Sequence, residues 1–212
     1  MYIQLALDRM TMDEAIHVTE EVYHEIDWIE VGTSLIKEYG VQSIERLKKE
    51  FPNKLLVADM KTMDNAAYEC QMCFEAGADV MTAMGVAPNI TVKTCLDEAK
   101  KRKKRVMIDL LNVHETLLPS LLEYKEAIFC LHVSKDEQEL FGFNAARFPM
   151  FLEEMQGRTW AIAGGISLDS LNMVKQLQPY VVIIGSAITK AENKQKAAQT
   201  LKQAIFARRS HG

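Results

Sequence analysis

No apolar stretch in the 212-residue chain approaches the roughly 18–20 uncharged residues that a membrane-spanning helix requires. The chain does not begin with a basic region followed by an apolar run, so we expect no secretory signal and a cytoplasmic protein. Only 10 residues are glycine and 5 are proline, whereas 48% are hydrophobic, which argues against disorder. The sequence therefore predicts a globular protein with a sizeable core and a single domain, 1–212.

Neither sign of charge dominates, because 25 basic residues are set against 29 acidic ones for a net charge of −4. This balance gives no overall attraction to nucleic acid, and we expect no nucleic-acid partner. One basic run, 100–105, contains no aromatic residue and follows a helical pattern. Because cations are favourable at the C-terminus of a helix, we interpret this run as a solvated helix end.

Cysteine is scarce, with four residues in all. Cys70 and Cys73 form a C-x-x-C motif, which in some proteins is a redox or zinc site. The sequence offers no second pair or nearby histidine to complete a metal site, and both cysteines lie in an apolar helical pattern. We therefore expect reduced thiols buried in the core.

Short apolar runs recur regularly along the chain. None exceeds seven residues, as is typical of parallel strands that are buried on both faces. Successive runs start 21 to 32 residues apart, which is enough for one crossover helix and two short loops. The predicted strands cover 3–8, 28–32, 55–61, 80–85, 106–111, 128–133, 160–164 and 181–185.

The segments between these runs have helical patterns. The first opens on a capping box formed by Thr11 and Glu14. Eight strand–helix units without a linker predict an α/β protein with a single (β/α)8 TIM barrel. A doubly wound sheet is the alternative, but it usually has fewer strands and favours a G-x-G-x-x-G motif that is absent here. The other predicted helices cover 41–51, 64–76, 90–101, 116–124, 145–155, 168–177 and 191–206.

Active sites of such barrels lie at the C-terminal ends of the strands and in the following loops. Five strand ends in this chain carry an acid, a lysine or a histidine. A carboxylate that ends an apolar strand must be paired or metal-bound, because an unpaired buried charge is very costly. One such residue would fit a structural ion pair, whereas a ring of them favours an active site. The ring consists of Asp8, Glu30, Asp59 with Lys61, Asp109 and His132.

The densest cluster of charge is the motif Asp59-Met-Lys61-Thr-Met-Asp64. Residues two apart on a strand project to the same side, and Asp64 opens the next helix. We expect the two acids to keep Lys61 protonated and in place. Such a lysine can stabilise an enolate or carbanion, or deliver a proton to one.

A lone histidine on an apolar strand is usually a satisfied core residue. His132, however, ends its strand at a mouth that contains several acids. A neutral imidazole is a suitable general base near pH 7. We therefore favour a catalytic role for His132.

Glycines mark the ends of the last two strands, as Gly164-Gly165 and Gly185-Ser186. Phosphate is commonly bound at these two strands of a barrel, by backbone N–H groups and a short helix N-terminus. Turn glycines would explain either pair alone. The two pairs together favour a phosphate site.

These residues resemble the orotidine 5′-monophosphate decarboxylase superfamily and, within it, the 3-hexulose-6-phosphate synthase family. The resemblance runs through nearly the whole chain, and the Lys-Thr-Met-Asp stretch makes it specific. Its motifs are Leu5-Ala-Leu-Asp8, Trp28-Ile-Glu-Val-Gly-Thr33, Ala58-Asp-Met-Lys-Thr-Met-Asp64, Phe74-Glu-Ala-Gly-Ala-Asp79, Gly85-Val-Ala87, Val106-Met-Ile-Asp-Leu110, Ala163-Gly-Gly-Ile166 and Gly185-Ser-Ala-Ile-Thr189.

The resemblance implies a carbon–carbon lyase that condenses formaldehyde with D-ribulose 5-phosphate through a 1,2-enediolate. It implies Mg²⁺, with Mn²⁺ as a substitute, held by Glu30 and Asp59, and oxygen ligands suit such hard cations. Lys61 would stabilise the enediolate. Asp64 would reach the active site of the neighbouring subunit in a homodimer.

Two alternatives remain open. The related 3-keto-L-gulonate-6-phosphate decarboxylases have glutamate at the position of Asp109, threonine at Ala163 and a phosphate-binding arginine at Ser186. Lys135 instead favours the decarboxylases, because it is similar to an arginine that they have at this position. The alternative that the protein has both activities therefore stays open. The second alternative is a sugar-phosphate binding protein that has lost catalysis. The intact ring of charged residues argues against it.

Overall fold

The computed structural model describes residues 1–141 and 153–207. Eight parallel strands form a closed barrel in which each strand pairs with its neighbours in the sequence, and the last pairs with the first. The prediction of a (β/α)8 TIM barrel is therefore confirmed. The strands are β1 (Tyr2–Leu7), β2 (Trp28–Val31), β3 (Leu55–Thr62), β4 (Val80–Met84), β5 (Arg105–Asp109), β6 (Ile128–His132), β7 (Thr159–Ala163) and β8 (Val181–Ile184).

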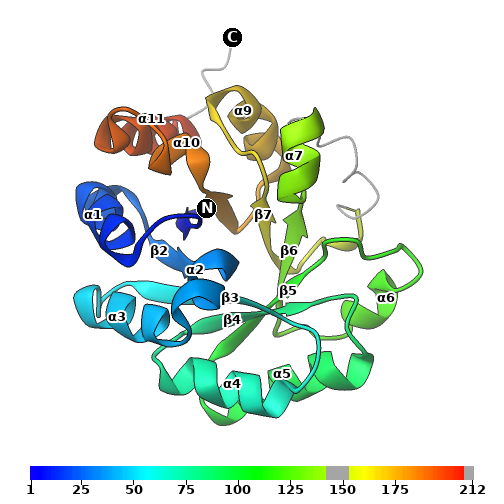
Figure 1. Ribbon diagram of the computed structural model, residues 1–212. Coiled ribbons are helices and arrows are strands. Elements are labelled where there is room, and N and C mark those ends of the chain that lie inside the picture. Colours follow the sequence, from blue (N-terminus) through cyan, green and yellow to red (C-terminus); the bar gives the residue numbers. More distant parts are fainter. Residues whose placement is uncertain (142–152, 208–212) are drawn as a thin grey trace.

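Helices surround the strands (Figure 1). The predicted capping box is present, since Thr11 Oγ1 accepts from the Glu14 N–H and Glu14 Oε2 from the Thr11 N–H. The helix predicted over 116–124 is only four residues long, and the one predicted over 145–155 lies mostly outside the described residues. The helices are α1 (Met12–Val22), η1 (Tyr23–Glu25), α2 (Thr33–Tyr39), α3 (Gln42–Glu50), α4 (Ala66–Glu75), α5 (Asn89–Lys101), α6 (Leu118–Leu121), α7 (Lys135–Phe141), α9 (Leu168–Leu177), α10 (Ser186–Thr189) and α11 (Lys194–Phe206).

Three of the α-helices, α2, α7 and α10, were not predicted. Each begins within two or three residues of the end of a strand and has seven residues or fewer. Helices this short complete too few turns to show a clear hydrophobic period. All three lie at the end of the barrel where the strands finish, so they help to shape its mouth.

Alternation along the strands divides the core into two layers. One face of each strand packs outward against the helices, and the other fills the barrel with residues such as Trp28, Val57 and Met107. Polar side chains replace these apolar ones near the C-terminal ends, where Asp59, Thr82 and Asp109 are buried. The lower half of the barrel interior is therefore mainly apolar, and the mouth is polar.

The cysteines are free and buried, as predicted. Cys70 lies in α4 and packs against α5, where its Sγ is 3.9 Å from the Cys95 carbonyl oxygen. Within the described residues, no helix is long and apolar enough to cross a membrane.

The basic run 100–105 is only partly a solvated helix end. Lys100 and Lys101 are exposed in the last turn of α5, in agreement with the prediction. Lys104 instead lies 2.7 Å from Asp79, and Arg105 lies over the Trp28 ring at 5.0 Å. Both partners lie far from the run in the sequence, so a local charge pattern could not indicate them.

Asp79 connects three elements at the lower end of the barrel. Its carboxylate accepts hydrogen bonds from Lys48 at 2.7 Å, from Lys104 at 2.7 Å and from the Leu56 N–H at 3.0 Å. Burial alone would raise the pKa of Asp79, but the hydrogen bonds from the two lysines lower it below its usual value. Asp79 therefore stabilises the fold at neutral pH.

We predict that Asp79→Asn lowers the free energy of unfolding by about 1–3 kcal/mol at pH 7, because hydrogen bonds to a charged group are lost. A lowered folded-state pKa contributes stability above the unfolded pKa, near 3.9, and loses it as the pH falls through the folded value. Urea unfolding should show the deficit at pH 7 and a smaller one below about pH 4. Asp97→Asn, which removes the exposed pair with Lys93, should cost less than about 0.5 kcal/mol. Equal losses in the two variants would contradict the prediction.

Candidate active site

A cavity of about 370 Å³ opens at the polar mouth of the barrel. This volume is within the range of small-molecule sites. The cavity collects every predicted catalytic, metal-binding and phosphate-binding residue except Asp64. Its lining includes Asp8, Glu30, Asp59, Lys61, Asp109, His132, Gly164, Gly165, Gly185 and Ser186.

Lys61 and Asp59 meet as predicted, but not through a regular strand. The Lys61 Nζ is 3.0 Å from Asp59 Oδ1 and 2.9 Å from Oδ2. The register between β3 and β4 shifts between Ala58 and Thr62, and Lys61 has a φ of +51°. The lysine therefore enters the site from a bulge in a left-handed backbone conformation, which simple alternation does not predict.

The second acid that contacts Lys61 is Asp109 rather than Asp64. Asp109 Oδ2 lies 3.2 Å from the Lys61 Nζ, although 48 residues separate the two in the sequence. Burial alone would lower the pKa of Lys61, but the charges of Asp59 and Asp109 raise it well above its usual value. Lys61 therefore stays protonated, as expected, although one of its two partners differs from the predicted one.

His132 is coupled to the same lysine through Asp109. Its Nδ1 is 2.8 Å from Asp109 Oδ2, which leaves Nε2 for a ligand in the cavity. Burial alone would lower the pKa of His132, but the hydrogen bond and charge of Asp109 raise it. For Asp109, burial alone would raise the pKa, whereas the hydrogen bond from His132 and the charge of Lys61 lower it. Asp109 thus stabilises the Lys61 ammonium and the protonated form of His132.

Glu30 and Asp59 stand side by side on neighbouring strands. Burial, followed by the charge of Asp59, raises the pKa of Glu30 to about 7. Gln4, on the interior of β1, donates a hydrogen bond of 2.5 Å to Glu30 Oε2. Two close acids with one side chain this hard to ionise form a pair that a bound cation would stabilise.

Asp8 lies at the rim and is exposed, contrary to the expectation of a buried carboxylate. Its Oδ1 accepts hydrogen bonds from the hydroxyl and the N–H of Ser34, the latter at 3.0 Å. Ser34 is in the first turn of α2, where the free N–H groups favour an anion. Asp8 therefore fixes the start of this helix at the edge of the cavity.

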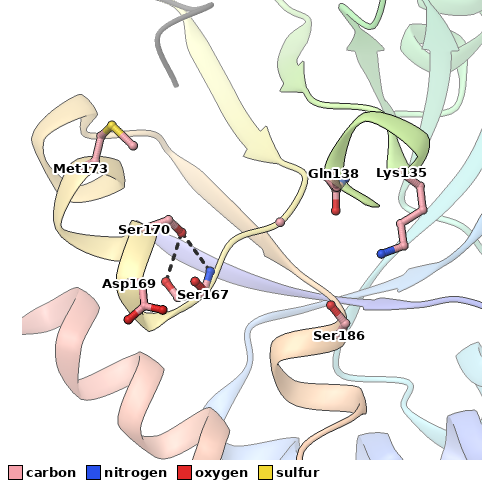
Figure 2. Close-up of a pocket in the computed structure, with 8 residues that line it drawn as sticks. Lys135, Gln138, Ser167, Asp169, Ser170, Met173 and Ser186 are labelled. Carbon is pink, nitrogen blue, oxygen red and sulfur yellow. Dashed lines mark hydrogen bonds between the residues drawn. The ribbon is translucent and has the colours of Figure 1, made fainter. Parts of the chain in front are cut away.

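Backbone close to the ends of β7 and β8 lines both the cavity and an adjoining hollow of about 550 Å³. Gly164 has a φ of +101°, and a Cβ there would lie 2.5 Å from the Val133 carbonyl oxygen, so the chain requires glycine. Figure 2 shows Lys135 and Gln138 of α7 on one side of the hollow and Ser167 and Asp169 on the other. Lys135, which is half-exposed, has a contact of 3.5 Å with Glu139. A lysine and glycine-rich backbone therefore lie at the place where phosphate binding is predicted.

Asp64 does not line the cavity of its own chain. It is exposed in the segment between β3 and α4, and its carboxylate accepts a hydrogen bond from the Asn65 N–H at 2.7 Å. Large apolar side chains near it in the sequence are also exposed, with Met63 at 46% and Tyr68 at 62%. Asp64 therefore lies apart from the other predicted site residues of its own chain.

Sequence reasoning missed three polar residues that support the charged groups. Gln4 donates a hydrogen bond to Glu30. Thr33 donates one to Asp59 Oδ2 at 2.7 Å, and Thr82 donates one to Asp59 Oδ1 at 2.9 Å. Gln4 and Thr82 each interrupt a run of apolar residues within a strand. A polar residue at an inward position of such a strand is the signal that could have indicated them.

The chain is similar to several characterised proteins. It is 35% identical to a 3-hexulose-6-phosphate synthase of Bacillus subtilis over 209 residues, covering 97% of this chain and 99% of that protein. A 3-hexulose-6-phosphate synthase structure from Salmonella typhimurium superimposes with a TM-score of 0.93 at 34% identity, covering 97% and 98% of the two chains. A 3-keto-L-gulonate-6-phosphate decarboxylase structure from Vibrio cholerae gives 0.85 at 28% identity, covering 96% of each chain.

Similarity to synthases is thus higher than to this decarboxylase, and the prediction of an enzyme of the synthase type is confirmed. The model of the orotidine 5′-phosphate decarboxylase / HUMPS family matches residues 1–201, which include all eight strands and all the residues of the mouth of the barrel. With fold, site and full-length relatives in agreement, the chain belongs to that family.

Proposed function

We propose that this protein condenses formaldehyde with D-ribulose 5-phosphate to give 3-hexulose 6-phosphate through a 1,2-enediolate. The observation that carries the proposal is the partly buried chain of contacts from Asp59 through Lys61 and Asp109 to His132. It combines a fixed cation with a group that can accept a proton. Full-length similarity to 3-hexulose-6-phosphate synthases supports the same reaction.

The phosphate group would bind at the ends of β7 and β8. Gly164, Gly165, Gly185 and Ser186 line the cavity there, and Lys135 adds a cation. This side of the mouth is formed by other strands than those that carry Glu30, Asp59 and Lys61. A sugar phosphate that spans the cavity would thus place its carbonyl end near the charged cluster.

His132 would remove the C1 proton through Nε2. The electron pair left at C1 forms the double bond of the enediolate, and the developing negative charge lies near the Lys61 ammonium. C1 then attacks the carbonyl carbon of formaldehyde, and the resulting alkoxide takes a proton, for which the His132 imidazolium is the candidate donor. Asp109 stabilises that imidazolium, which fits the raised pKa of His132.

Glu30 and Asp59 fit a divalent cation such as Mg²⁺ or Mn²⁺. They are neighbouring hard oxygen donors, and burial, followed by the charge of Asp59, raises the pKa of Glu30. Across residues 1–141 and 153–207, no three acidic, histidine or cysteine side chains gather as a metal site, so water or substrate oxygens would complete the coordination. The metal would neutralise negative charge on the substrate oxygens.

The functional unit would be a homodimer with shared active sites. Asp64 is exposed and lies outside its own cavity, while Met63 and Tyr68 beside it present apolar surface. Exposed apolar side chains of this kind are common where a partner binds. This arrangement would let Asp64 complete the site of the second subunit.

Purified protein should consume ribulose 5-phosphate and formaldehyde together and form a hexulose 6-phosphate when Mg²⁺ is present. Chelation should abolish turnover, and added Mg²⁺ or Mn²⁺ should restore it, because Glu30 and Asp59 alone leave the negative charge uncompensated. Full activity of metal-free protein would refute the metal requirement. Faster release of CO₂ from 3-keto-L-gulonate 6-phosphate than condensation would assign the chain to the decarboxylases instead.

A further inference from the structure

Lys61 reaches the active site through a backbone conformation that is unfavourable for a lysine. Its φ of +51° is in the left-handed region, and the β3–β4 register shifts between Ala58 and Thr62, the interval that contains Lys61. A bulge of this type redirects a side chain. Because the conformation is costly by itself, neighbouring groups must hold it in place.

Thr82, at the centre of β4, contacts both ends of this arrangement. Its hydroxyl accepts a hydrogen bond from the Lys61 backbone N–H at 2.8 Å and donates one to Asp59 Oδ1 at 2.9 Å. The same Asp59 oxygen is 3.0 Å from the Lys61 Nζ. Thr82 is only 4% exposed, so these bonds are shielded from water. One hydroxyl therefore connects the backbone of the lysine to the carboxylate that holds its side chain.

A hydroxyl is suited to this double contact because it has one donor and two acceptor lone pairs. Valine has nearly the same shape and the same preference for strands, but it can form neither bond. Serine keeps both bonds and loses only a methyl group. The pair of substitutions thus separates hydrogen bonding from packing.

The geometry assigns to Thr82 the role of a positioning residue: its hydroxyl holds the bulge at Lys61 and the carboxylate of Asp59 together, and so determines where the Lys61 ammonium lies. The effect on catalysis rests on the proposed function. The effect on the backbone rests on the contacts of Thr82 alone.

Thr33 offers a matched comparison. Its hydroxyl is 2.7 Å from Asp59 Oδ2 and 2.8 Å from the Asp59 carbonyl oxygen. Thr33 approaches from the β2 side, whereas the bond to the Lys61 N–H comes from Thr82. Thr33→Val therefore weakens the hold on Asp59 without removing the partner of the Lys61 amide.

The test compares Thr82→Val, Thr82→Ser and Thr33→Val by two measurements. Steady-state kinetics with ribulose 5-phosphate, formaldehyde and Mg²⁺ gives kcat and KM. Hydrogen–deuterium exchange, followed by NMR in protein without metal or substrate, reports the protection of the Lys61 amide. The second measurement does not depend on any enzymatic activity.

For Thr82→Val we expect kcat to fall about 10- to 100-fold, because a displacement near 1 Å of a catalytic group has effects of this size. KM for the sugar phosphate should change little, since the proposed phosphate site lies at other strands. The Lys61 amide should exchange at least about tenfold faster. Thr82→Ser should have a kcat and a Lys61 amide exchange rate close to those of wild type. Thr33→Val should leave the Lys61 amide protected.

Three results would overturn the assignment. The first is a Thr82→Val variant whose kcat and Lys61 amide exchange rate are the same as in wild type. The second is a Thr82→Ser variant that is as impaired as Thr82→Val. The third is a Thr33→Val variant in which the Lys61 amide exchanges as fast as it does in Thr82→Val. Wild-type protein that does not turn over ribulose 5-phosphate would refute the proposed function. The amide exchange would then still decide the positioning role of Thr82.

Discussion

Replacing His132 by asparagine should slow the exchange of the C1 proton of ribulose 5-phosphate by about 10²–10⁴-fold, the usual effect of removing a general base. Deprotonation precedes the attack on formaldehyde in the proposed reaction. Wild-type protein with Mg²⁺ in D₂O should therefore incorporate deuterium at C1, stereospecifically, without formaldehyde. NMR of the recovered sugar phosphate measures this directly. The asparagine side chain can still donate a hydrogen bond to Asp109, which limits disturbance of the pair with Lys61.

The pH dependence of the same exchange provides a second measure of His132. Its pKa is raised above 6.5, since the hydrogen bond and charge of Asp109 outweigh the effect of burial. The neutral imidazole, which is the base, is therefore lost as the pH falls through a value above 6.5. Wild-type exchange should decline on this acidic side, and the residual exchange of His132→Asn should lack that step.

A control variant and one contrary outcome complete this test. His114→Asn changes an exposed histidine whose hydrogen bonds are to Thr116, and exchange should remain at the wild-type rate. If His132→Asn exchanges as fast as wild type while binding substrate, His132 is not the base. Asp109 would then be the next candidate.

Mixing two inactive variants, Lys61→Ala and Asp64→Ala, should restore activity if Asp64 acts across a dimer interface. Each variant alone should lose about 10²–10³-fold or more in kcat, as expected when a group that stabilises developing charge is removed. In a heterodimer both lesions fall in one site, and the other site is intact. Random mixing makes half of the dimers heterodimers, so about a quarter of wild-type sites should reappear.

The matched control mixes Lys61→Ala with His132→Asn. Both side chains line the cavity of the same chain, so every site in the heterodimer carries one lesion and no activity should return. Subunit exchange is verified separately by mass spectrometry of differently tagged chains. Recovery in the control, or none in the first mixture despite exchange, would refute a shared site built with Asp64.

The sequence alone was enough to predict the barrel and the residues at its mouth. Strand positions agree within one or two residues at each end, because strands buried on both faces need nearly continuous apolar runs. Once eight strands alternate with helices, the rule that strand ends share one face brings Glu30, Asp59, Lys61, Asp109 and His132 together. Periodicity and topology therefore predicted which residues lie together at the mouth of the barrel.

Only the tertiary structure decided how those residues are paired. Asp109 rather than Asp64 contacts Lys61. Asp8 is exposed and accepts a hydrogen bond from the Ser34 N–H, and Thr82 holds the bulge at Lys61. Each contact joins residues that lie between 21 and 48 positions apart in the sequence. Local patterns record which face a residue occupies, whereas such contacts depend on strand register, on a left-handed residue and on the stagger of a closed barrel.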